Sequence, residues 1–190
     1  MRALRQQAPR PATQGESAER VAVSLRRIEV LALDIDGVLT DGTVTWDAVG
    51  RASKTISYQD IDAVFLARRQ GLRVVLITGE DSAWVKMAAA RLHADRVYAG
   101  AKDKAQAVRA LRRELKVERG AICLVGDSAR DVEAFAHVGV ALAPADATAV
   151  ARAAAHRVLK RPGGRGAVAE AVGLILQGHR REGCNLNEGR

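Results

Sequence analysis

The sequence predicts an α/β fold in which a mostly parallel sheet lies between two layers of helices. From Val30 onward, short apolar runs that end in a polar residue or glycine alternate with longer amphipathic stretches. Only 3% of the residues are aromatic, so Val, Leu, Ile and Ala must form most of the core, as in strands buried between helices. A chain of 190 residues is long enough for one domain with a sizeable core.

Each expected strand is an apolar run, and each expected helix carries apolar residues on one face. The expected strands are residues 30–33, 74–77, 96–98, 122–125 and 138–141, and the expected helices are residues 60–70, 81–92, 104–115, 129–136, 149–155 and 166–176. A short helix over residues 17–27 would begin at Ser17 as its N-cap. Strands that alternate with helices predict a Rossmann-like, three-layer α/β/α sandwich.

A small β-hairpin flap is expected between the first two of these strands. Residues 43–46 and 52–56 flank residues 47–50, which have the composition of a glycine-containing turn.

The net charge of +8 comes from the two ends of the chain. Residues 28–156 carry 17 basic and 17 acidic residues, whereas both ends carry an excess of Lys and Arg. We therefore expect no nucleic-acid partner, although the basic ends could attract polyanions weakly in a salt-dependent way. We expect residues 1–27 to be a flexible basic leader with a short helix, and residues 179–190 to be a flexible tail.

No apolar run reaches the ~20 residues that span a bilayer, and residues 1–27 lack the apolar centre of a secretory signal. We expect a cytoplasmic protein without a membrane partner. Cys123 and Cys184 lack metal-ligand spacing, and Cys123 lies in an apolar run, so it is expected in the core.

Two carboxylates, Asp34 and Asp36, directly follow the first expected strand. The carboxyl ends of strands are where α/β folds place their active sites. Successive strand side chains point to opposite faces, so the two can share a site only if the chain turns sharply, which Gly37 permits. Two close carboxylates repel each other unless a cation lies between them or one keeps its proton, and the pair therefore implies Mg²⁺.

Three later segments add groups suited to phosphate chemistry. Thr78 and Gly79 follow the second strand and could donate hydrogen bonds to phosphoryl oxygens, although Thr78 could equally be a helix N-cap. Lys104, at the start of a helix, could neutralise phosphate charge. Asp127 and Asp131 follow the fourth strand and offer the oxygen ligands that Mg²⁺ prefers.

In order and spacing, these segments resemble the four motifs of the haloacid dehalogenase superfamily of phosphohydrolases. Within it, the chain resembles the 3-deoxy-D-manno-octulosonate 8-phosphate phosphatase family, in Asp60 and in residues 34–42, 77–79, 138–139, 145–147 and 163–168. The resemblance extends to about Leu176 and implies a phosphatase domain over residues 28–178.

The superfamily resemblance implies that Asp34 attacks phosphorus, while Asp36 protonates the leaving oxygen and then activates water, with an aspartyl-phosphate between the two steps. Thr78 and Lys104 would hold the phosphoryl oxygens, and Asp131 would orient Lys104 or a metal-bound water. The residues expected at Mg²⁺ are Asp34, Asp36 through its carbonyl, Asp127 and Asp131. The residues expected to bind substrate are Gly37, Asp60, Gly79, Glu80 and Arg165.

No large cap domain fits between Asp36 and Thr78, so closure of the site is expected from another subunit. The family resemblance implies a homotetramer in which the glycine-rich residues 163–166 reach a neighbouring site, with Arg165 as a partner for a substrate carboxylate.

Two positions depart from the family. Its arginine after Thr-Gly is Glu80 here, and its glycine-rich stretch after Asp60 reads Ile61-Asp62-Ala63. A Glu80 that points into the pocket would disfavour a substrate carboxylate. We therefore predict a phosphorylated sugar or sugar acid other than the octulosonate phosphate.

Purely structural roles and other functions remain alternatives at this point. Asp60 could simply cap a helix, and Trp46 and Trp84 could be packing residues. A catalytically silent relative could serve as an interaction or regulatory module, but intact Asp34 and Asp36 argue against it. A phosphosugar mutase would use the same aspartate but needs a cap to exclude water.

Overall fold

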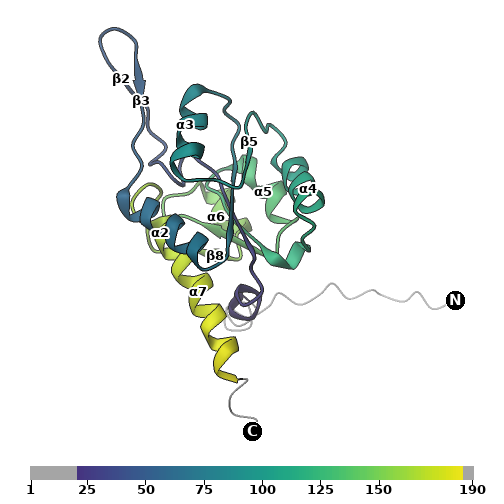
Figure 1. Cartoon of the computed structure of the whole chain (residues 1–190). Coiled ribbons are helices and arrows are strands. Elements are labelled where there is room, and N and C mark those ends of the chain that lie inside the picture. Colours follow the sequence, from purple (N-terminus) through teal and green to yellow (C-terminus); the bar gives the residue numbers. More distant parts are fainter. Residues whose placement is uncertain (1–20, 186–190) are drawn as a thin grey trace, which may run out of the picture.

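A six-stranded parallel sheet forms the centre of the molecule (Figure 1). The computed structural model describes residues 21–185 of the chain, with the side chains of residues 21–180. The strands lie in the order β5-β4-β1-β6-β7-β8, with every neighbouring pair parallel. Their bounds are β1 Val30–Leu33, β4 Arg73–Ile77, β5 Arg96–Tyr98, β6 Ile122–Val125, β7 Val140–Ala143 and β8 Arg157–Val158. The chain builds outward from β1 first on one side and then on the other, which creates a topological switch point beside β1.

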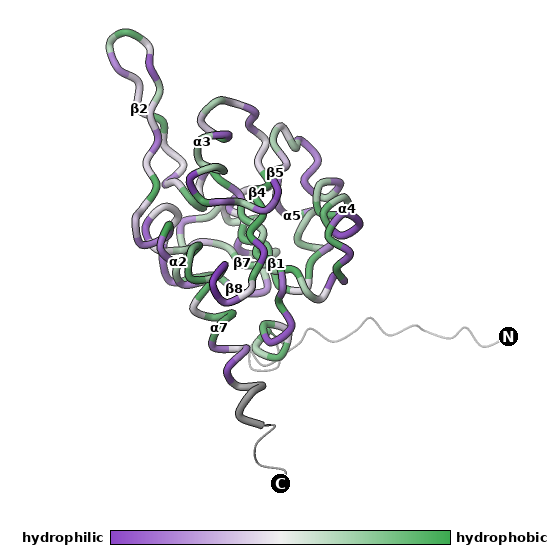
Figure 2. The backbone as a smooth tube through the Cα atoms, viewed as in Figure 1, coloured by the Kyte–Doolittle hydropathy of each residue, from purple (hydrophilic) through white to green (hydrophobic). Residues whose placement is uncertain are grey.

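Helices cover both faces of the sheet, and their bounds are α2 Tyr58–Arg69, α3 Ala83–Arg91, α4 Lys104–Leu115, α5 Ala129–Phe135, α6 Ala149–Ala154 and α7 Ala167–Asn185. Leu31 and Leu33 of β1 pack in the same core cluster as residues of α2, α3 and α7. Val30 and Ala32 pack against residues of α4, α5 and α6. Figure 2 shows the hydrophobic segments gathered along the central strands. The alternation of strand side chains thus produces the predicted three layers.

The five predicted strands and the predicted helices occur in the expected order. β7 begins two residues later than expected. Gly139, which precedes it, lies against Gly120, where a Cβ would meet the Gly120 carbonyl oxygen at 2.5 Å. The short, exposed strand β8 was not predicted, because two residues carry no periodicity.

Both chain ends are only partly described. Residues 21–25 are helical, and the predicted N-cap Ser17 lies outside the described residues, as does most of the predicted leader. α7 continues to Asn185, so the tail expected from residue 179 begins inside a helix. No helix in the described part of the chain has both the length and the apolar character needed to cross a membrane.

The predicted hairpin projects from the body of the molecule (Figure 1). It consists of β2 (Thr45–Trp46) and β3 (Ala52–Ser53), which are antiparallel. Asp47 orders its turn, since it accepts hydrogen bonds from the backbone N–H groups of Val49 and Arg51. Only this hairpin and α2 lie between β1 and β4, so the structure contains no large cap domain there.

Candidate active site

The chain turns sharply where β1 ends, in the segment that we call the Asp34 loop (residues 34–42). Asp34 continues the pairing with β6, and its Oδ1 accepts a hydrogen bond of 2.7 Å from Ile35 N. The carbonyl oxygen of Ile35 then accepts hydrogen bonds from the N–H groups of residues 38–40, and Gly37 has a φ of 82°. A Cβ at position 37 would lie 2.3 Å from Asp127 Oδ2, so only glycine fits. The turn brings Asp34 and Asp36 into one pocket, as the sequence predicts.

A pocket of about 500 Å³ lies at the carboxyl ends of the central strands. It collects the residues predicted from all four motifs, which are Asp34, Asp36, Thr78, Gly79, Glu80, Lys104 and Asp127. Thr78 follows β4, Lys104 is the first residue of α4, and Asp127 follows β6. The parallel topology therefore places groups from distant parts of the sequence at one edge of the sheet.

Lys104 lies in a buried cluster of charges at the wall of this pocket. Its Nζ donates to Asp34 Oδ2 at 2.5 Å and to Asp131 Oδ1 at 2.6 Å, and its side chain is only 3% exposed. The other oxygen of Asp131 accepts hydrogen bonds from Asp127 N at 3.2 Å and from Ser128 N and Oγ at 3.0 Å. Asp131 thus fixes the position of Lys104 and of the backbone that carries Asp127.

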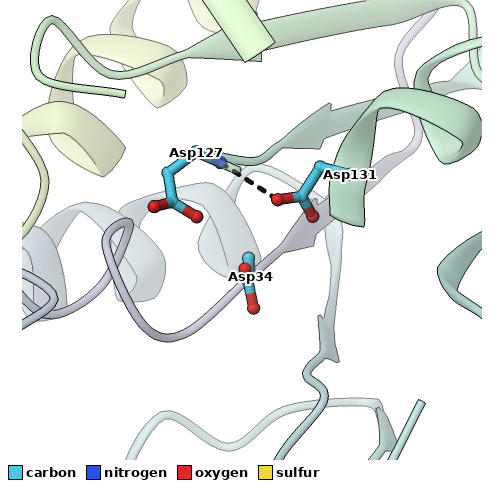
Figure 3. Close-up of side chains that lie close together, drawn as sticks. All are labelled: Asp34, Asp127 and Asp131. Atoms are coloured by element: carbon cyan, nitrogen blue, oxygen red, sulfur yellow. Dashed lines mark hydrogen bonds between the residues drawn. The ribbon is translucent and has the colours of Figure 1, made fainter. Parts of the chain in front are cut away.

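The carboxylates of Asp34, Asp127 and Asp131 form a compact group with oxygens within 4.8 Å of one another (Figure 3). Burial raises the pKa of Asp34 to about 7, although Lys104 acts in the opposite direction. Burial, together with the negative charge of Asp131, raises the pKa of Asp127 to about 6. Burial removes the water that would stabilise the negative charges of Asp34 and Asp127, and the ion pair with Lys104 does not replace it fully. A hard cation bound between these carboxylates would stabilise their charges again.

The donor set fits a divalent metal bound by oxygen atoms. Asp131 is fully buried, does not line the pocket and accepts four hydrogen bonds, whereas each oxygen of Asp34 accepts only one. Asp34 and Asp127, which line the pocket, are therefore the carboxylates open to a cation. The side chain of Asp36 lies outside this group, and its carbonyl oxygen stays a predicted ligand.

Sequence reasoning missed Lys54, which follows β3 and holds the Asp36 carboxylate. Its Nζ donates to Asp36 Oδ1 at 2.8 Å and to Glu80 Oε2, and it lies 5.3 Å from the ring centre of Trp84. The Lys54 side chain is only 9% exposed. A single lysine in a hairpin stem has no motif spacing, and the contact exists only because the hairpin stem returns to the pocket.

Glu80 lines the pocket, but its charge is compensated. Hydrogen bonds from Lys54 and from Ser82 Oγ hold the pKa of Glu80 below its usual value. The sequence predicts an added negative charge at position 80, and the ion pair with Lys54 compensates that charge.

Asp60 does not line the pocket and is fully buried. Its Oδ2 accepts a hydrogen bond from Gly166 N and its Oδ1 accepts one from Ala169 N, both at 2.9 Å. Asp60 therefore caps the first turn of α7 from the neighbouring helix α2. This structural role replaces the substrate contact that the sequence predicted.

The glycine-rich residues 163–166 pack against the Asp34 loop of their own chain. A Cβ at Gly163 would lie 2.0 Å from the Gly37 carbonyl oxygen, and Gly164 N donates to Val38 O at 2.9 Å. Arg165 is 72% exposed and lies 3.8 Å from Asp41, outside the pocket. Within one chain this segment supports the loop, and Arg165 does not line the pocket.

Comparisons with known proteins agree with this arrangement. A family model described as haloacid dehalogenase-like hydrolase matches residues 48–139. The chain is 32% identical over 153 residues to the 3-deoxy-D-manno-octulosonate 8-phosphate phosphatase of Haemophilus influenzae, a match that covers 80% of this chain and 85% of that protein.

Solved structures show the same fold. A hydrolase of the HAD superfamily, subfamily III A, from Legionella pneumophila matches with a TM-score of 0.84 and 29% identity, over 87% of this chain and 91% of that chain. The Moraxella catarrhalis 3-deoxy-D-manno-octulosonate 8-phosphate phosphatase, in complex with magnesium ion, phosphate ion and KDO, matches with a TM-score of 0.82 and 26% identity, over 90% and 99% of the two chains. The chain therefore belongs to the haloacid dehalogenase-like hydrolases, in the family of the 3-deoxy-D-manno-octulosonate 8-phosphate phosphatases, and it is a phosphatase.

Proposed function

We propose that this phosphatase hydrolyses a small phosphorylated sugar or sugar acid similar to 3-deoxy-D-manno-octulosonate 8-phosphate. The reaction is Mg²⁺-dependent and proceeds through an aspartyl-phosphate. The observation that carries the proposal is the convergence of Asp34, Asp36, Lys104 and Asp127 on one pocket. The Moraxella relative, which holds magnesium, phosphate and KDO, supports the same assignment.

Asp34 is the nucleophile. Its carboxylate lies at the end of a buried strand, where Ile35 N and Lys104 hold one oxygen each. Mg²⁺, bound by Asp34 and Asp127, supplies positive charge that reduces the repulsion between the carboxylate and the phosphate. Lys104 adds a buried positive charge, and Thr78 accepts a hydrogen bond from Glu80 N, which leaves its hydroxyl proton for a phosphoryl oxygen.

Asp36 transfers the protons. It gives a proton to the leaving oxygen and then takes one from the water that hydrolyses the aspartyl-phosphate. Lys54 holds its carboxylate at the pocket wall, and this contact keeps the acid close to the leaving group.

The substrate class includes sugar acids. The prediction of a substrate other than the octulosonate phosphate depended on a free negative charge at position 80, and the pairing of Glu80 with Lys54 removes this reason to exclude a carboxylate.

The decisive experiment measures phosphate release from p-nitrophenyl phosphate and 3-deoxy-D-manno-octulosonate 8-phosphate, with Mg²⁺ and with EDTA. We expect Mg²⁺-dependent turnover of both, loss of about 10³-fold or more in Asp34→Asn, and inhibition by beryllofluoride, which traps Asp34 in a form that mimics the aspartyl-phosphate. A panel of sugar phosphates ranks the substrates. Asp62→Asn, an exposed change on α2, is the matched control. If the protein turned over no phosphate ester, the result would support the alternative of a catalytically silent interaction or regulatory module.

We also propose that the hairpin mediates the homotetramer that completes the site. Trp46 and Val49 near its tip are 67% and 75% exposed, which is unusual for large apolar side chains on a free surface. Sedimentation velocity should show tetramers, and Trp46→Ser with Val49→Asp should give smaller species. Unchanged tetramers in the double variant would place the interface elsewhere. The cytoplasmic location stays a prediction.

A further inference from the structure

We propose that Lys102 and Arg130 form a second anion-binding subsite at the rim of the active-site pocket. The subsite binds a carboxylate or a second phosphate on the leaving group of the substrate. This inference rests on the proposed phosphatase function, and it names the substrate feature that the pocket selects.

The charged groups of Lys102 and Arg130 both lie close to Gly79. Lys102 precedes α4, and its Nζ donates to Gly79 O at 2.7 Å. Arg130 is in α5, and its Nη1 lies 3.6 Å from the point that a Cβ of Gly79 would occupy. These distances place the two charged groups no more than about 10 Å apart. A carboxylate or phosphate that accepts one hydrogen bond from each cation joins nitrogens up to about 8 Å apart. Both side chains are long and exposed, so a small rotation suffices for both to contact the same anion.

Among the cations at the pocket, these two are the ones without a carboxylate partner within residues 21–180. Lys104 is paired with Asp34 and Asp131, and Lys54 is paired with Asp36 and Glu80. Within residues 21–180, neither Lys102 nor Arg130 forms an ion pair, and both line the pocket. Both are exposed, so a substrate can reach them from solvent.

The position of the subsite defines the kind of ligand. Gly79 directly follows Thr78, which lines the pocket beside the buried cation Lys104, and the proposed mechanism assigns both residues to the transferred phosphoryl group. The second anion must therefore belong to the same small molecule as the scissile phosphate. A sugar acid phosphate and a sugar bisphosphate both meet this requirement.

The test compares substrates that differ only in the second anion. 6-Phosphogluconate is paired with glucitol 6-phosphate, which has a hydroxymethyl group in place of the carboxylate, and fructose 1,6-bisphosphate is paired with fructose 6-phosphate. We expect kcat/KM to favour the anionic member of at least one pair by about tenfold. The pair with the larger preference identifies whether the subsite takes a carboxylate or a phosphate.

Lys102→Gln and Arg130→Gln should each lower this preference about threefold to tenfold, mainly through KM for the anionic substrate. Their combination should bring the preference close to one. Arg113→Gln, at an exposed arginine of α4 outside the pocket, is the matched control and should keep the preference.

Equal kcat/KM within both pairs for the unmodified enzyme would overturn the proposal. An equal loss on every substrate, including p-nitrophenyl phosphate, would also overturn it, because the cations would then hold the transferred phosphoryl group. Turnover of p-nitrophenyl phosphate reports the phosphatase chemistry separately. If that turnover is absent, the proposed function fails, and the subsite fails with it.

Discussion

Replacement of Asp60 tests whether this buried carboxylate supports the fold or contacts substrate. It accepts hydrogen bonds from Gly166 N and Ala169 N, and both bonds are lost in Asp60→Ala. A hydrogen bond to a charged group contributes about 1.5 kcal/mol, and the two N–H groups at the start of α7 would be left without an acceptor. The free energy of unfolding should therefore fall by about 3 kcal/mol.

Urea denaturation followed by circular dichroism measures this change. With a slope near 2 kcal/mol per molar urea, the midpoint should move down by about 1.5 M. Asp60→Asn keeps one acceptor but turns an amide nitrogen toward the other N–H, so about half of the loss is expected. Asp62→Ala, at an exposed position on the same helix, should change the free energy of unfolding by less than about 0.5 kcal/mol.

The kinetic behaviour of the same variants separates the two roles. A structural cap predicts reduced stability with KM nearly unchanged for enzyme that remains folded. A midpoint within about 0.3 M of the unmodified protein, together with a KM raised about tenfold, would refute the structural assignment and restore the substrate contact.

Three further changes probe other parts of the structure. Gly163→Ala places a methyl group against the Asp34 loop and should lower the free energy of unfolding by about 3 kcal/mol. Gly173→Ala adds a methyl group in α7 that meets no atom within 4 Å, and it should raise the free energy of unfolding by about 0.5–1 kcal/mol. Thermal denaturation measures both changes. Lys54→Met should lower kcat about tenfold and change KM little, and unchanged kcat in steady-state assays would contradict its role at Asp36. Burial lowers the pKa of His156 below its ordinary 6.5, and its Nδ1 accepts a hydrogen bond from a backbone N–H. The unfolded chain therefore binds the proton more readily, so the free energy of unfolding should fall as the pH drops below about 6.5, and His156→Asn should flatten that slope in denaturation series.

The sheet and the catalytic cluster could be predicted because both depend on local patterns. Each apolar run that ends in a polar group marks a strand and its carboxyl end, and a parallel sheet brings those ends together. Asp34, Thr78, Lys104 and Asp127 follow from this rule and from the motif resemblance, although they are far apart in the sequence.

The remaining features depend on contacts between segments that carry no pattern of their own. Asp60 has the sequence context of a residue in the first turn of α2, yet it caps α7, more than a hundred positions away. In the sequence, the clustered glycines at residues 163–166 indicate only a loop. The structure shows that the backbone of the Asp34 loop occupies the space that a Cβ at position 163 would need. Such roles follow from helix packing and close backbone approach, which periodicity does not encode.

The hairpin contributes a side chain to the contacts in the pocket. Its stem supplies Lys54, the residue that holds both Asp36 and Glu80, so the position of the proton-transferring carboxylate depends on the hairpin. An arginine at position 80 would place a second cation beside Lys54, whereas Glu80 gives that lysine a partner on the wall opposite the hairpin. The departure from the family at position 80 is therefore an electrostatic complement to Lys54, and it leaves the binding of a further substrate anion to Lys102 and Arg130.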